Sequence, residues 1–288
     1  MRVAVTGATG TIGREVVRQL RERGDAVIAV SRDPASAGME AVGWDALDLS
    51  GFDGVVNLAG ARIDQRWSDA GKRQIRESRI DSTKRVVDAL RAADPRPRVL
   101  VSQSAEGYYA RGNDPVREDA PPGTGFLSEV VQAWEAEARK AEELGVRVVT
   151  TRTGVVLSRD GGALPKMLTP FKLGVGGPVA GGNQPFPWVH VRDAAGAIVF
   201  LLDNDSAGGA VNVVAPDKQT NKTFTKTLGR VIRRPTVFPV PSLAMKVLYG
   251  EMGSTVTEGS NPDPAKLVEL GYRYEKARLD DALRAELG

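Results

Sequence analysis

The sequence contains no cysteine and only one histidine, His190. The absence of cysteine excludes disulfides, thiolate metal sites and a cysteine nucleophile. A site built from several histidine ligands is excluded as well, and with it the common hydrolytic zinc centres. We therefore expect no metal site in this protein.

Long apolar runs are also absent. No stretch of the sequence is long enough to span a bilayer, and the first apolar segment is strand-like and followed by glycines, unlike a signal peptide. We expect a cytoplasmic protein without a membrane partner. The 39 Lys and Arg and the 36 Asp and Glu residues are interspersed, so the net charge indicates solvated helix faces rather than a nucleic-acid partner.

What the sequence does contain is an alternation of short apolar runs and amphipathic stretches. Strand-like runs such as "AVIAVS" and "RVLVSQS" alternate with helix-like stretches such as "SDAGKRQIRESRIDSTKRVVDAL". This alternation predicts an α/β fold, a Rossmann-type doubly wound parallel sheet with helices on both faces. The 288 residues are enough for one such unit and a smaller lobe.

The alternation changes near Gly161. Residues 174–190 are rich in glycine and proline and indicate a long surface segment, and the C-terminal end predicts two short helices. We predict a Rossmann domain over residues 1–160 plus parts of 190–215. Most of residues 161–288 would form a smaller C-terminal α/β lobe that binds the substrate.

The stretch "VAVTGATGTIGREVV" predicts a dinucleotide site. Its glycines are spaced three residues apart between a predicted strand and a predicted helix. Such a loop needs glycine for a tight turn, for close approach to a pyrophosphate and for packing of the helix on the strand. The start of the helix then offers N–H groups to the phosphates. The candidate contacts are Gly7, Thr9, Gly10, Thr11, Ile12 and Gly13.

The end of the second predicted strand indicates which dinucleotide binds. An NAD site usually has an acidic residue there to hold the ribose, whereas this sequence has Ser31 and Arg32. A guanidinium favours the 2′-phosphate of NADP, so we predict NADP(H) as the cofactor. The alternative is that Arg32 is an ordinary surface arginine. Further candidate cofactor contacts are Asp45, Leu58, Ala59 and Gly60.

These motifs together resemble the extended short-chain dehydrogenase/reductase superfamily. The resemblance depends on "TGATGTIG", "NLAG", Ser104 and "WVHVRDAAGAI". "RWSDAGKRQIRESRIDST", "RTGVVLSRDGGALPKML" and "GEMGSTVTEGSNPDPAKLVELGYRYE" narrow it to the NAD(P)-dependent epimerase/dehydratase branch known as SDR39U1 or YfcH-like. The resemblance spans essentially the whole chain. It implies a Rossmann domain that binds NADP(H) and a small C-terminal lobe, without a defined substrate, and it adds Arg152, Gly154 and Val155 to the candidate cofactor contacts.

Reductases of this superfamily usually carry a Tyr-x-x-x-Lys pair at the start of the helix that follows the Ser104 strand. The tyrosine transfers a proton, while the lysine lowers the tyrosine pKa and holds the nicotinamide ribose. In this sequence Phe126 and Val130 occupy the corresponding places. Since neither side chain exchanges a proton, the usual pair is missing.

The stretch "SAEGYY" offers other catalytic candidates. Ser104 would hydrogen-bond the reacting group, and Tyr108 or Tyr109 would donate a proton, because a phenol with a pKa near ~10 is a poor base at neutral pH. Each has a structural alternative, in which the serine caps a turn and the tyrosines pack the lobe interface. Candidate substrate contacts are Glu106, Trp188 and His190, although a lone histidine is more often a structural residue.

These observations predict an NADP(H)-dependent oxidoreductase or epimerase that acts on an unidentified small molecule. The substrate itself could be activated enough for hydride transfer to need little help. A different class, a non-catalytic NADP(H)-binding sensor or interaction module, is the alternative function. The predicted helical stretch over residues 66–90 lies where related proteins can pair, which leaves a homodimer open.

Overall fold

A seven-stranded parallel sheet forms the centre of the molecule, with the strand order β11-β7-β5-β4-β1-β2-β3. The computed structural model describes residues 1–65, 67–243, 245, 250–253 and 257–288, so residues 66 and 254–256 of the family-like motifs lie outside the described residues. The strands are β1 Arg2–Thr6, β2 Ala26–Ser31, β3 Ala41–Gly43, β4 Gly54–Asn57, β5 Val99–Ala105, β7 Arg147–Thr153 and β11 Gly209–Val213. The chain reverses its direction of travel across the sheet between β1 and β4. Ligands of such sheets bind at this reversal point.

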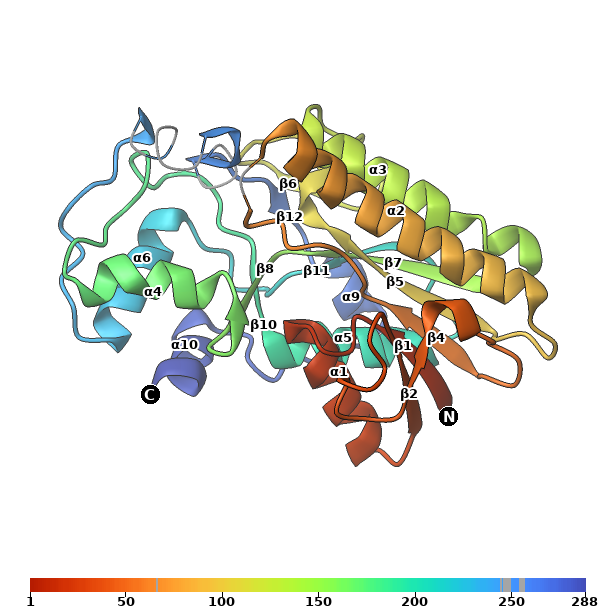
Figure 1. Cartoon of the computed structure of the whole chain (residues 1–288). Helices are drawn as coiled ribbons and strands as arrows, with labels where there is room; N and C mark the ends of the chain where they lie inside the picture. The colour runs from red at the N-terminus through yellow and green to blue at the C-terminus, as the bar shows by residue number, and fades with distance from the viewer. Residues whose placement is uncertain (66, 244, 246–249, 254–256) are drawn as a thin grey trace.

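Helices cover both faces of the sheet (Figure 1). The helices α1 Thr11–Glu22 and α5 Val191–Asp203 lie on one face, and α2 Asp69–Ala92 and α3 Phe126–Arg139 lie on the other. Alternate residues of each strand point to opposite faces. In β1, Val3 and Val5 pack with α1 and α5, whereas Ala4 packs on the side of α2. The predicted doubly wound parallel sheet is confirmed.

The smaller lobe has its own three-stranded sheet and its own apolar core. Its strands are β8 Val155–Ser158, β9 Gly161–Gly162 and β10 Trp188–His190, and its helices are α4 Leu164–Lys172, α6 Asn221–Val231 and α10 Leu279–Leu287. Trp188, Phe224 and Leu283 are buried together in this core. Thr220 caps α6 by accepting a hydrogen bond from the Thr223 N–H at 3.2 Å. The smaller C-terminal lobe is thus confirmed.

Several short elements complete the described chain. The single-turn helices are η1 Trp44–Ala46, η2 Glu106–Tyr108, η3 Glu142–Leu144 and η4 Gly250–Gly253. A two-stranded sheet pairs β6 Pro115–Val116 with β12 Asn261–Pro262, and α9 Ala265–Glu269 follows it. None of the described helices is both long enough and apolar enough to cross a membrane.

The predicted domain boundary at residue 160 does not separate the two packing units. Segments on each side of it pack in the other unit. After β7, the chain passes through Gly154 directly into β8, which pairs with β10 in the lobe sheet. In the other direction, Leu267 of α9 is part of the core beneath the main sheet. Asp193, in the first turn of α5, accepts hydrogen bonds from the N–H groups of Glu275 and Lys276 at 2.7 and 2.9 Å. Local patterns do not encode such long-range pairings.

Candidate functional site

The glycine loop between β1 and α1 is closed by main-chain contacts that leave no room for larger residues. Gly7 has a φ of 65°, and a Cβ at this position would lie 2.7 Å from the carbonyl oxygen of Leu58. A Cβ at Gly13 would overlap the Gly7 carbonyl oxygen. Gly10 precedes α1 without providing a side-chain cap. The loop therefore has the close packing and the uncapped helix start that a diphosphate requires.

The "NLAG" segment after β4 is held beside this loop by a buried hydroxyl. Thr6 Oγ1 accepts hydrogen bonds from the N–H groups of Leu58 and Ala59, both at 3.0 Å. The same hydroxyl donates to Asn57 Oδ1 at 2.8 Å. The ends of β1 and β4 are thereby locked together at the reversal point of the sheet. The predicted contacts Leu58 and Ala59 do lie next to the glycine loop.

The end of β2 presents a free guanidinium. Arg32 is exposed and forms no ion pair within the described chain. The carboxylate of the neighbouring Asp33 accepts hydrogen bonds from the N–H and the hydroxyl of Ser36. These hydrogen bonds lower the pKa of Asp33. Ser31 Oγ accepts a hydrogen bond from the Asp33 N–H at 3.1 Å. Asp45 is fully exposed, and its carboxylate lies 3.4 Å from the guanidinium of Arg85.

The lobe reaches over the start of α1. Gly161 of β9 lies so close to the Thr11 hydroxyl that a Cβ at Gly161 would overlap it. Arg14 donates hydrogen bonds to the carbonyl oxygens of Thr9 at 2.8 Å and Asp160 at 3.3 Å. The hairpin of β8 and β9 thus lies against the predicted contact Thr11, and Arg14 links it to the predicted contact Thr9, which is exposed. Ile12 is half-buried and packs against the core beneath the sheet.

A buried polar cluster, made of Ser104, Tyr109, Glu135, Arg152 and Asn212, lies between β5, β7, β11 and α3. Arg152 donates to both carboxylate oxygens of Glu135, at 2.8 and 2.9 Å. Ser104 Oγ donates to Glu135 at 2.6 Å. The Tyr109 hydroxyl donates to Asn212 Oδ1 at 2.6 Å and accepts from Arg152 at 3.0 Å. Every member of the cluster has a partner.

The cluster contains three residues for which the sequence predicts a role in the site, namely Ser104, Tyr109 and Arg152. Burial raises the pKa of Tyr109 to about 12, although the hydrogen bond from Arg152 opposes this shift. Burial alone would lower the pKa of Arg152, but the hydrogen bonds and charge of Glu135 raise it above its ordinary value. In this structure the Ser104 and Tyr109 hydroxyls and the Arg152 guanidinium are committed to the protein. Their predicted catalytic and cofactor roles stay predictions.

Sequence reasoning missed Glu135, the centre of this cluster. One signal is visible in the sequence, because Glu135 stands on a helix beside apolar positions such as Val131 and Ala138, which are buried. A carboxylate on such a face needs a cationic partner when it is buried. The identity of that partner, Arg152, depends on a strand that follows later in the chain.

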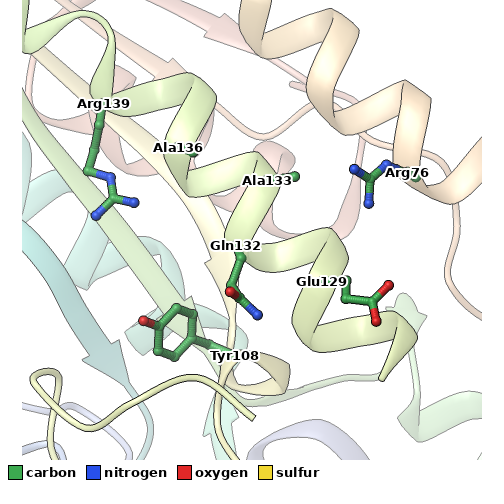
Figure 2. A pocket seen from close by; sticks show the side chains of 7 residues that line it. All are labelled: Arg76, Tyr108, Glu129, Gln132, Ala133, Ala136 and Arg139. Atoms are coloured by element: carbon green, nitrogen blue, oxygen red, sulfur yellow. The ribbon is translucent and has the colours of Figure 1, made fainter. Parts of the chain in front are cut away.

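Tyr108 is arranged differently from Tyr109. Its ring lies 3.4 Å from the Arg152 guanidinium carbon, and its hydroxyl has no hydrogen-bond partner among the residues described. The side chain borders an open pocket of about 540 Å³. Figure 2 shows this pocket, with Glu129, Gln132, Ala133, Ala136 and Arg139 along α3, Arg76 on α2 and Tyr108 below. Of the two tyrosines, only Tyr108 has a hydroxyl free to meet a ligand.

Helix α3 contains neither tyrosine nor lysine anywhere between Phe126 and Arg139. The Phe126 ring lies against the Trp67 ring, with centroids 5.1 Å apart, and 5.3 Å from the ammonium nitrogen of Lys72. The first turn of α3 therefore packs against the start of α2.

The predicted substrate contacts do not share one open site. Glu106 accepts a hydrogen bond from Ser260 and lies 3.5 Å from Arg111. Trp188 is buried in the lobe core, where its indole N–H donates to the Asp217 carbonyl oxygen at 2.9 Å. These two side chains belong to different parts of the fold.

His190 is buried at the start of α5. Its Nδ1 accepts a hydrogen bond from the Arg192 N–H at 3.2 Å, and its Nε2 lies 2.9 Å from a carboxylate oxygen of Glu286. Burial lowers the pKa of His190, although the Glu286 charge opposes the shift. The remaining candidates, Gly154 and Val155, lie where β7 passes into β8, and a Cβ at Gly154 would be 2.6 Å from the Pro187 carbonyl oxygen.

Comparison with known proteins places the chain in a family. Residues 3–214 match the NAD dependent epimerase/dehydratase family, and residues 240–286 match a domain of unknown function, DUF1731. The chain is 40% identical to the Arabidopsis thaliana "Epimerase family protein SDR39U1 homolog, chloroplastic", over 99% of this chain and 86% of that protein. It is 38% identical to the Bos taurus SDR39U1 protein, over 99% of both chains.

A solved structure agrees with this placement. Human SDR39U1, crystallised with NADPH, is 35% identical and superposes with a TM-score of 0.93, covering 100% of this chain and 99% of that one. The chain therefore belongs to the NAD dependent epimerase/dehydratase family and is similar to its SDR39U1 members. The resemblance that the motifs predict is confirmed.

Proposed function

We propose that this member of the epimerase/dehydratase family is an NADP(H)-dependent oxidoreductase or epimerase acting on a small molecule. One observation carries the proposal: the glycine loop closes against Leu58 beside a free Arg32 at the end of β2. The loop would hold a diphosphate by its main-chain N–H groups, and the guanidinium would hold the 2′-phosphate. The NADPH in the structure of the human relative supports this choice of cofactor.

The residues present fit the cofactor, because the close approaches at Gly7 and Gly13 exist only without side chains. When bound, NADP(H) supplies or accepts a hydride. The protein's part is then to place the reacting group and to exchange a proton. We assign the proton to Tyr108, whose hydroxyl is unpartnered within the described residues, and keep Ser104 as the candidate that hydrogen-bonds the reacting group.

Calorimetry on cofactor-free protein tests the proposal. We expect NADPH to bind more tightly than NADH, and Arg32→Ala to weaken NADPH by about 10–100-fold, as expected for one lost charge-assisted hydrogen bond. NADH affinity should not change in this variant. Arg91→Ala removes another exposed arginine, at the far end of α2, and serves as the control. Failure of the wild-type protein to bind either dinucleotide would overturn the proposal.

The second candidate function is a cofactor-binding sensor without turnover. The specific observation in its favour is that α3 has neither tyrosine nor lysine, while the Ser104 and Tyr109 hydroxyls are bound internally. Incubating the NADPH complex with a panel of carbonyl, enone and imine compounds separates the two functions. Oxidation of the bound NADPH by any of these compounds supports the enzyme, and its absence across the whole panel supports the sensor.

A further inference from the structure

Four large apolar side chains are exposed at one edge of the C-terminal lobe. Leu173 and Val175 lie just after α4 and are 73% and 55% exposed. Val237 and Phe238 follow α6 and are 71% and 57% exposed. A single exposed apolar side chain is ordinary, but several on neighbouring segments form a patch, and such a patch usually marks an interaction surface.

The two segments that carry these side chains lie side by side. The Val240 N–H donates to the Pro178 carbonyl oxygen, and the Ala180 N–H donates to the Val240 carbonyl oxygen, both at 2.9 Å. A Cβ at Gly177 would overlap the Phe238 carbonyl oxygen. Both segments run along the edge of the lobe in Figure 1, beside α4 and α6. The four side chains therefore belong to one surface, which we call the lobe-edge patch.

The segments around the lobe-edge patch are exclusively basic. Residues 161–186 and 218–243 contain no aspartate and no glutamate. Within these ranges, Arg230 is paired with Asp280 of α10. Five other basic side chains are exposed and form no ion pair within the described residues: Lys172, Lys222, Lys226, Arg233 and Arg234.

This charge belongs to the lobe rather than to the whole chain. The chain has 39 Lys and Arg and 36 Asp and Glu. Because none of the acidic residues falls in the two ranges, the rest of the chain contains more acidic than basic residues. A surface with one sign of charge attracts partners of the opposite sign. The partner of the lobe-edge patch should therefore be anionic, and it also has to accept apolar side chains.

We propose that the lobe-edge patch docks on the surface of an anionic lipid bilayer. The free lysine and arginine side chains would meet the lipid phosphates, and the four apolar side chains would enter the boundary between headgroups and acyl chains. Nucleic acid is a poorer match, because it is bound by phosphate contacts and aromatic stacking, whereas three of the four exposed side chains are aliphatic.

This docking goes beyond the proposed enzymatic function and does not depend on it. The expectation of no membrane partner came from the absence of a spanning segment, and attachment to one face of a bilayer requires none. The glycine loop and Arg32 belong to the main sheet, whereas the lobe-edge patch belongs to the lobe. Changes in the patch should therefore leave the affinity for NADPH at the wild-type value.

Sedimentation of the full chain with vesicles tests the proposal. We expect binding to vesicles of equal parts phosphatidylcholine and phosphatidylglycerol, and little binding to phosphatidylcholine alone. Binding should weaken as salt rises from ~0.05 to ~0.5 M, because the charges are then screened. Absence of binding to the anionic vesicles at low salt would overturn the proposal.

Two double variants separate the contributions of charge and apolar contact. Arg233→Asn/Arg234→Gln should weaken binding to the anionic vesicles by about 25-fold, about fivefold for each charge. Leu173→Ser/Phe238→Ser should weaken it by about tenfold or more, because the inserted side chains are lost. Normal vesicle binding by either double variant would contradict the patch as the docking surface.

A matched control removes two exposed basic side chains of the main domain, which form no ion pair within the described residues. In Arg21→Gln/Lys84→Gln, vesicle binding should stay within about threefold of wild type, since only general attraction is reduced. A loss as large as that of the lobe variant would show a response to net charge alone, against the proposal.

Other anionic partners are tested with duplex DNA and poly-glutamate as probes. Tight binding of either probe without binding to the anionic vesicles would assign the patch to a nucleic acid or an acidic protein and overturn the lipid assignment. Thermal unfolding excludes a folding defect. Arg233 has a φ of 55°, a conformation that asparagine adopts more readily, so the Tm of Arg233→Asn/Arg234→Gln should equal or exceed that of wild type.

Discussion

Two arginines close to the carboxyl edge of the sheet, the buried Arg152 and the half-buried Arg79, differ in their partners. Arg152 meets both oxygens of Glu135, whereas Arg79 meets one main-chain carbonyl. A buried ion pair contributes little compared with an apolar pair of the same size, but loss of one partner leaves an uncompensated charge. The two positions should therefore respond to neutral substitutions with opposite changes in stability.

We expect Arg152→Met to lower the free energy of unfolding by about 3–5 kcal/mol, because Glu135 stays behind as an unpaired buried carboxylate. The double variant Arg152→Met/Glu135→Met should recover much of this loss. Urea denaturation measures both. Arg117→Met, which breaks the exposed pair with Glu269, is the control and should cost less than about 1 kcal/mol. A stable Arg152→Met single variant would contradict the buried-pair description.

The adjacent tyrosines should separate stability from turnover. Tyr109→Phe leaves Asn212 and Arg152 without the buried hydroxyl, so we expect a loss of about 1–3 kcal/mol in unfolding free energy. Tyr108→Phe removes a hydroxyl that has no partner in the described structure and should leave the stability unchanged. If Tyr108 donates the proton, its variant also loses turnover of NADPH. Denaturation measures the stability of both variants, and stopped-flow fluorescence of NADPH measures their turnover. A destabilised Tyr108→Phe variant together with a Tyr109→Phe variant of normal stability would contradict both assignments.

At the level of single residues, the sequence predicts some roles better than others. Roles that depend on the local backbone, such as a glycine in a tight loop, can be predicted. Roles that depend on a side chain distant in the sequence cannot. The spacing of Gly7, Gly10 and Gly13 predicts the closed loop, because the requirement for a missing Cβ is local. The cluster around Glu135 could not be predicted, since its partners come from β5, β7 and β11. Whether a hydroxyl such as that of Ser104 is free depends on tertiary contacts that no local pattern encodes.

At the scale of single elements, the residue type tolerated at the start of α1 is determined by its fit against the glycine loop rather than by helix propensity. Alanine normally stabilises a helix relative to glycine by about 0.5–1 kcal/mol. In Gly13→Ala, however, the new Cβ would overlap the Gly7 carbonyl oxygen. We expect a lower Tm and at least tenfold weaker binding of NADPH in this variant, measured by thermal unfolding and calorimetry. Gly208→Ala, which meets no atom within 4 Å, is the control.

The main helices and strands of the sheet could be predicted because each has a clear period and a clear end. Helix α1 ends at Glu22, two residues before Gly24, a residue type that commonly ends helices. That β8 belongs to the second sheet could not be predicted, because "RTGVVL" appears as one continuous strand in the sequence. The structure divides it at Gly154, where the close approach of Pro187 directs the chain into the second sheet.

At the scale of the whole molecule, the single histidine gives stability a dependence on pH. Burial lowers the pKa of His190, with Glu286 and Asp193 opposing the shift and Arg192 adding to it. The unfolded chain, with a histidine pKa near ~6.5, therefore takes up the proton first as the pH falls. Stability should be greatest above pH ~6.5 and decline below it, by at most about 1.4 kcal/mol at pH ~5.5.

Thermal unfolding between pH ~7.5 and ~5.5 measures this dependence. His190→Asn keeps an acceptor for the Arg192 N–H, because asparagine is a favourable cap, and removes the titrating ring. We expect the decline in Tm to be smaller in this variant. The same slope in both proteins would assign the pH dependence to other groups.

The hydrogen bonds of Asp193 have a consequence for how this family can be engineered. Its carboxylate belongs to the stretch matched by the epimerase model, while Glu275 and Lys276 belong to the stretch matched by DUF1731. The two matched regions are consequently not interchangeable modules. A chimera that grafts the tail of a relative onto residues 1–240 will assemble only if the transplanted segment brings back main-chain donors for that carboxylate.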